Sequence, residues 1–137
     1  MMIRFLLPLA LALASLENVA TSTPADAADA LKAIRACVAC HTFEKGGTPK
    51  IGPNLYGIVD KPAARVSGFD KYGIDMRDAA AKGLAWTPDN IDAYIADPVA
   101  FLKAATGKAE VRTNMIARVR KPEERAAIID YLKTLKD

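Results

Sequence analysis

The chain has few of the residues that build thiol and metal sites. Of its 137 residues, two are cysteine and one is histidine. A structural zinc site usually needs four Cys or His ligands, so these three side chains cannot complete one. The lack of a second histidine also excludes any metal site with two histidine ligands.

Long apolar runs are missing from all but the first residues. Phe5–Leu16 is the one such run, and it is shorter than the roughly 20 residues of a membrane-spanning helix. Met1–Arg4 gives it a cationic start, and small residues ending in Ala25-Asp26-Ala27 follow, as in a secretory signal peptide. We therefore expect residues 1–27 to be a cleaved signal peptide and residues 28–137 to be one domain exported to the periplasm. An uncleaved membrane anchor is the alternative.

A strong excess of one charge is also absent. The chain has 19 Lys and Arg against 16 Asp and Glu, a formal net charge of +3. This excess is too small to predict nucleic-acid binding, and aromatic residues are not interleaved with the basic ones. A mildly basic surface is suited to docking on acidic proteins, where charge mainly sets the encounter rate.

Strand-like alternation of apolar and polar residues is lacking, which predicts an all-α fold of about four to five short helices. Helical spacing, capping residues and helix-terminating glycines set the expected ranges. These are 29–39, 74–82, 87–97, 98–106 and a last helix from 122. The glycines and prolines of residues 42–59 predict a loop. In residues 108–120 the apolar residues follow no regular spacing. The expected buried face of the last helix is Ile128, Ile129, Leu132 and Leu135.

All the cysteine and histidine of the chain falls in one motif, Cys37-Val38-Ala39-Cys40-His41. Cys-x-x-Cys-His is the pattern of c-type haem attachment, in which two sulfurs add to the haem vinyl groups and the histidine binds the iron. A thioredoxin-like pair has the same cysteine spacing but belongs in a βαβ context. A structural disulfide is possible in an exported protein, although it leaves the adjacent histidine unexplained.

The opposite face of such an iron holds a protein ligand, water or a substrate, and methionine is the usual protein ligand where a second histidine is lacking. Two methionines follow the predicted signal peptide, Met76 and Met115. Met76 falls within an expected helix at a spacing typical of core residues, and core filling is the ordinary role of methionine. Met115 lies in the irregular stretch before the last helix, where a loop can fold back over a haem. We favour Met115, with Met76 as the alternative.

From Cys37 onward the sequence resembles the class I c-type cytochromes, most closely the bacterial cytochrome c2 subgroup. The resemblance implies a small cytochrome c fold around one covalent haem c, with His41 and Met115 as axial ligands. The motifs that carry it, in order, are Cys37 to His41, Lys45-Gly46-Gly47, Gly52-Pro53-Asn54-Leu55, Gly83-Leu84-Ala85-Trp86-Thr87, Tyr94 with Asp97-Pro98, Thr113-Asn114-Met115, and Lys121-Pro122-Glu123-Glu124-Arg125 to Tyr131-Leu132.

The resemblance implies further roles around the haem. The carbonyl of Pro53 would accept the ring N–H of His41. Trp86 would donate a hydrogen bond to a haem propionate, and Tyr72 would share that task. The hydroxyl of Tyr94 would approach the methionine sulfur.

The resemblance also implies a function. The protein would be a monomeric electron carrier and not an enzyme, taking electrons from a membrane-bound, quinol-oxidising cytochrome bc complex. Its acceptor would be a terminal oxidase or a photosynthetic reaction centre. A haem subunit or dedicated electron acceptor of a periplasmic dehydrogenase is the alternative, and a ligand-binding or peroxidase-like haem protein is a second. We expect several basic residues to form a docking ring, the alternative being scattered surface charge: Arg35, Lys45, Lys50, Lys108, Arg112, Arg118, Arg120 and Lys121.

Overall fold

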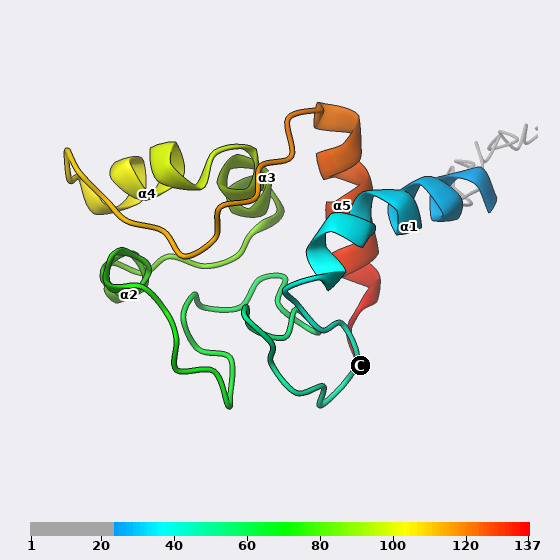
Figure 1. Cartoon of the computed structure of the whole chain (residues 1–137), viewed down its shortest axis with the longest axis horizontal. Coiled ribbons are helices and arrows are strands. Elements are labelled where there is room, and N and C mark those ends of the chain that lie inside the picture. The colour runs from blue at the N-terminus through cyan, green and yellow to red at the C-terminus, as the bar shows by residue number, and fades with distance from the viewer. Residues whose placement is uncertain (1–23) are drawn as a thin grey trace, which may run out of the picture.

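A computed structural model describes residues 24–137, and the expected signal peptide lies largely outside them. Five helices make up the regular structure of this range (Figure 1): α1 (Pro24–Val38), α2 (Ile74–Ala81), α3 (Pro88–Ala96), α4 (Pro98–Thr106) and α5 (Pro122–Thr134). The only strand-like pairing in the described residues is an isolated bridge between Pro62 and Ala85. The all-α prediction is therefore confirmed. None of the described helices is long and apolar enough to cross a bilayer.

Capping residues set the ends of α3 and α4. Thr87 caps α3 by accepting the N–H of Asn90. Asp97 ends α3 and also caps α4, because its side chain accepts the N–H groups of Val99 and Ala100. Such caps each contribute about 1 kcal/mol to stability. These features are readable in the sequence, so the expected and observed bounds of α2 to α5 nearly coincide.

The first helix begins earlier than expected. α1 starts at Pro24, whereas the periodicity predicted a start at Asp29. The expected cleavage point after Ala27 therefore falls within its first turn. The helix ends at Val38, one residue before the predicted end.

Two core clusters hold the helices together. The first lies mainly where α1 crosses α5, the helix pair that Figure 1 shows on the right. Its buried members are Ile34, Ile58, Ile91, Ile95, Ile128, Ile129 and Leu132. Of the face expected on α5, Leu135 is only partly buried. The second cluster consists of Ala63, Met76, Ala79 and Leu102. Trp86 and Tyr94 pack against both clusters and so bridge them.

The long loop after α1 is fixed by a buried side chain. Asn54 is 8% exposed, and its amide nitrogen donates to the carbonyls of Glu44 and Gly47 at 2.9 and 3.1 Å. Its side-chain oxygen accepts the N–H of Tyr56 at 2.9 Å. Because a buried polar group is costly unless it is bonded, this network gives the loop one conformation. The loop carries Pro53 past the end of α1.

Candidate functional site

The two cysteines and the histidine lie at the C-terminal end of α1. The carbonyl of Cys37 accepts the N–H groups of Cys40 and His41, at 3.0 and 2.9 Å. This turn places both thiols and the imidazole close together. Both cysteines are free and half-buried. Burial raises the pKa of the Cys37 thiol, and the neighbouring Cys40 raises it further.

His41 is held by one hydrogen bond that defines its tautomer. Its Nδ1 lies 2.7 Å from the carbonyl oxygen of Pro53. A carbonyl can only accept, so Nδ1 carries the proton and donates, which leaves the lone pair on Nε2. Burial lowers the pKa of His41, against the Pro53 bond that raises it. The ring is therefore neutral near pH 7 and able to ligate a metal through Nε2.

The imidazole also packs against the backbone of Gly52. A Cβ at this position would lie 2.4 Å from Cε1 and 2.7 Å from Nδ1 of His41. The N–H of Gly52 donates to the carbonyl of Cys40 at 2.8 Å, which anchors this loop to the motif. Only glycine fits here. The sequence motif contains Gly52 and Asn54. Their roles could not be predicted from it, because the groups that they contact come together only in the folded chain.

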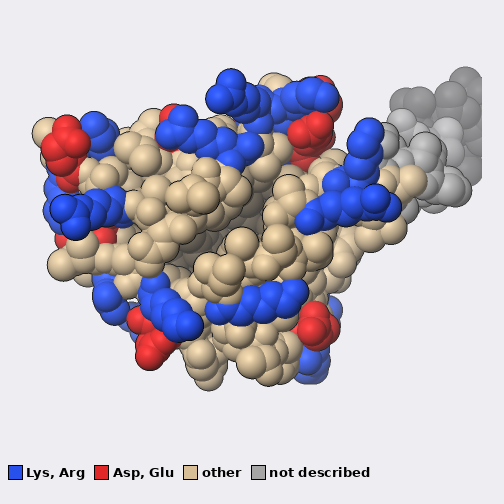
Figure 2. Space-filling model, viewed as in Figure 1, with Lys and Arg blue, Asp and Glu red and all other residues tan. Residues whose placement is uncertain are grey.

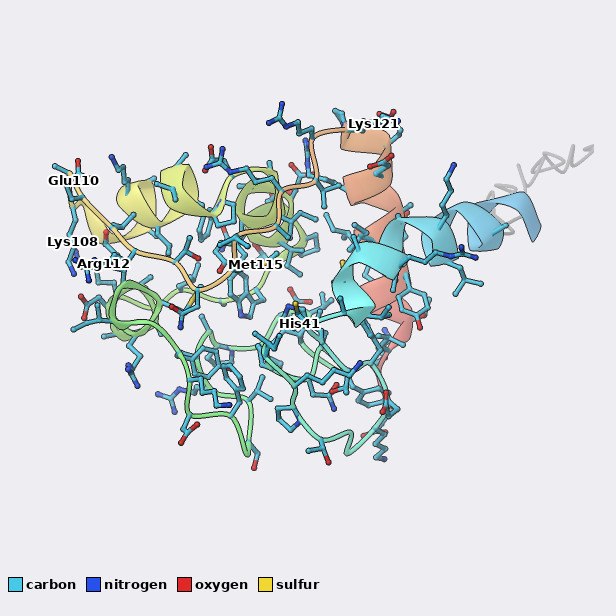
Figure 3. The ribbon with its side chains drawn as sticks, viewed as in Figure 1. His41, Lys108, Glu110, Arg112, Met115 and Lys121 are labelled. Carbon is cyan, nitrogen blue, oxygen red and sulfur yellow. The ribbon has the colours of Figure 1, made fainter. Side chains whose placement is uncertain are left out.

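Met115 reaches the centre of the molecule from the segment between α4 and α5. Figure 3 shows both Met115 and His41 at the centre. His41 follows the end of α1, so the two side chains come from different parts of the chain. The hydroxyl oxygen of Thr113 accepts the N–H of Met115 at 3.1 Å and lies 3.5 Å from the hydroxyl of Tyr94. Tyr94 thus approaches the methionine loop through Thr113. Met76, the alternative ligand, is 8% exposed and packs within the second cluster.

Of the remaining predicted residues, Trp86 and Tyr94 pack against both clusters and Tyr72 packs against the second. Trp86 packs on Tyr94 with ring centroids 5.0 Å apart. Its indole N–H forms no hydrogen bond within residues 24–137, so it can donate to an added group. Tyr72 accepts the N–H of Val66 at 3.2 Å, which leaves its own O–H free to donate. Burial raises the pKa of both tyrosines, so both hydroxyls stay protonated at neutral pH.

These residues fit a haem. Figure 2 shows a hollow in the middle of one face, with visible walls of uncharged residues. The described residues contain no group of three or more His, Cys, Asp or Glu that could bind a bare metal ion. A metal at His41 would therefore need most of its ligands from elsewhere, as a porphyrin supplies. Two free thiols, an unprotonated Nε2 and a thioether complete the set that a covalent haem requires.

Half of the eight basic residues in the predicted docking ring form ion pairs with acidic residues. Four of its cations form ion pairs: Lys45 with Asp137, Lys108 with Asp75 and Asp78, Arg118 with Asp97, and Lys121 with Glu124. Within the described residues, Arg35, Lys50, Arg112 and Arg120 form none. Figure 2 shows Lys and Arg side chains on several sides of the hollow, with acidic side chains mostly farther out.

Comparisons with known proteins identify the family of this chain. The cytochrome c family model matches residues 25–136. A cytochrome c-550 of Novispirillum itersonii is 45% identical over 111 residues, covering 81% of this chain and 99% of the relative. A cytochrome c2 of Rhodospirillum rubrum is 40% identical over 111 residues, covering 81% and 98%. The solved structure of cytochrome c2 from Rhodospirillum centenum superposes with a TM-score of 0.75 at 32% identity, covering 80% and 98%. The chain therefore belongs to the cytochrome c family, and it is an electron-transfer protein that carries one covalently attached haem c.

Proposed function

We propose that Cys37 and Cys40 would hold the haem through thioether bonds and that His41 and Met115 would be its iron ligands. The observation that carries this proposal is the placement of the His41 ring and the Met115 side chain at the centre of the molecule, on two different segments. When bound, the haem supplies a one-electron change of iron oxidation state, and a Met/His ligand pair raises its reduction potential. With both His41 and Met115 as ligands, the iron would exchange electrons and would not bind a substrate.

The other site residues keep this arrangement fixed. Pro53 and Gly52 together hold the His41 ring in one orientation and tautomer. Trp86 and Tyr72 would donate hydrogen bonds to the haem propionates. A site that does not rearrange when its charge changes is suited to repeated electron transfer, because the protein's part is binding, orientation and electrostatics.

The partners are two membrane complexes. A quinol-oxidising cytochrome bc complex donates the electron, and a terminal oxidase or a photosynthetic reaction centre accepts it. The protein works as a monomer in the periplasm, with residues 1–27 as its export signal. The similarity to a cytochrome c2 and a cytochrome c-550 supports this kind of partner. The cations without ion pairs would meet acidic docking surfaces on both partners.

The ligand pair can be tested by visible and far-red spectroscopy of the ferric protein. The wild type should show the thioether-to-ferric charge-transfer band, and Met115→Ala should lose it because the sixth ligand is gone. Met76→Leu is the matched control, since it nearly conserves the volume of a buried side chain. Loss of the band in Met76→Leu but not in Met115→Ala would reassign the ligand. Carbon monoxide binding to the ferrous wild type at neutral pH would show an open iron and overturn the proposal.

A further inference from the structure

Helix α2 runs beside the segment that leads to Met115, and polar contacts join the two along their length (Figure 1). Lys82, at the C-terminal end of α2, donates to the carbonyl of Thr106. One turn earlier, Asp78 pairs with Lys108. In the first turn, Asp75 contacts both Lys108 and Arg112. The numbering rises along one element as it falls along the other, so the segment lies antiparallel to α2.

Of the acidic residues in these contacts, Asp75 is the most deeply buried. Its side chain is 6% exposed, and both carboxylate oxygens are used. Oδ1 accepts from the Lys108 ammonium at 2.7 Å, and Oδ2 accepts from the backbone N–H of Arg112 at 2.7 Å. The Lys108 bond is the main cause that holds the pKa of this carboxyl below its ordinary value. Hydrogen bonds with a charged partner are shorter and about twice as strong as neutral ones.

The contact between Asp75 and the Arg112 N–H is important because it lies close to Met115 in the sequence. Arg112 is three residues before Met115, a distance of about 10 Å in extended chain. In between, Asn114 donates to the carbonyl of Lys71 at 2.9 Å, an exposed contact. Beyond Met115, the next backbone tie to a helix is the N–H of Val119 to the carbonyl of Ile95 at 2.8 Å. Among these ties, only the Arg112 N–H bonds to a buried charge.

We infer that Asp75 is a positioning residue for Met115: it holds the loop against α2 so that the thioether stays on the iron. This inference rests on the proposed role of Met115 as ligand. Asp75 does not touch the haem site itself, and acts through the backbone at Arg112. If it loses its charge, the loop leaves α2 more often, and an external ligand competes for the iron more successfully.

Imidazole binding to the ferric holoprotein tests this inference. Asp75→Asn should bind imidazole roughly tenfold to a hundredfold more tightly than the wild type, because a bond to a charged group is lost. It should also weaken the charge-transfer band. Asp78→Asn is the matched control, since Asp78 pairs with the same lysine from the same helix but does not contact Arg112. It should change the affinity much less.

The outcomes separate the two proposals. If the wild type lacks the band, or Met115→Ala keeps it, the ligand assignment fails. If those two behave as expected but Asp75→Asn binds imidazole like the wild type, the positioning role is refuted, even if its denaturation midpoint falls. If Asp75→Asn does not mature with haem, Lys108→Gln decides the matter. It removes the partner of Oδ1 and should raise the imidazole affinity, and an unchanged affinity would overturn the inference.

Discussion

The contact between Gly52 and His41 allows a sharp prediction about a single methyl group. In Gly52→Ala the added Cβ would lie 2.4 Å from Cε1, 2.7 Å from Nδ1 and 2.9 Å from Nε2 of the ring. Carbon atoms pack at about 3.5–4.0 Å, so the ring or the loop must move by roughly 1 Å. Neither can move freely, because Nδ1 is bonded to Pro53 and the Gly52 N–H is bonded to Cys40.

The expected cost follows from these two effects. Overpacking of this kind costs about 1–3 kcal/mol, and loss of one of the hydrogen bonds adds about 1 kcal/mol. Gly52→Ala should therefore lower the free energy of unfolding of the holoprotein by about 2–4 kcal/mol. Guanidinium denaturation followed by haem absorbance and by circular dichroism measures this change.

Gly73→Ala is the control. Gly73 has φ −61°, and the nearest atom to its added Cβ, on Asn114, would be 3.6 Å away. With neither strain nor clash, the gain of up to about 1 kcal/mol from unfolded-state entropy opposes the poorer fit of alanine at the N-cap of α2, so stability should change by no more than about 1 kcal/mol. If Gly52→Ala is as stable as Gly73→Ala and its histidine NMR signals are unchanged, the steric reasoning is wrong.

Two further predictions concern charge. The rate of electron transfer to an acidic partner complex should fall as ionic strength rises, because salt screens the docking cations. Stopped-flow kinetics measures this rate, and a rate that does not change with ionic strength would contradict the predicted docking ring. The second concerns acid stability. Since the folded-state pKa of Asp75 is lowered, its stabilising effect is present above the unfolded pKa of about 3.9 and is lost as pH falls through the folded pKa. Denaturation midpoints measured against pH should therefore fall less steeply in acid for Asp75→Asn than for the wild type, and parallel curves would contradict this.

Much of the fold could be predicted because the relevant signals are local. Thr87-Pro88 and Asp97-Pro98 each combine a capping side chain with a proline that suits the first helical position, so the starts of α3 and α4 are written in adjacent residues. Gly107 has φ +73°, the left-handed conformation that ends α4. The haem motif is equally local, because one helical turn sets the spacing of its two cysteines.

The rest depends on contacts between distant residues. Nothing around Asp75 distinguishes it from an exposed helix acid, since its partners lie 33 and 37 residues away. The pairing of Lys45 with Asp137 at the other end of the chain likewise could not be read from either neighbourhood. The start of α1 was predicted wrongly for a different reason: small residues before Asp29 suit both a helix and a cleavage site.

The crossing of α1 and α5 joins the two ends of the described chain. The helix that presents Cys37 thus has its main packing partner in Pro122–Thr134, a segment far along the sequence. Until that helix has formed, Ile34 has no apolar surface from it to cover it. Cys37 therefore stands on an unfinished framework until this long-range contact forms.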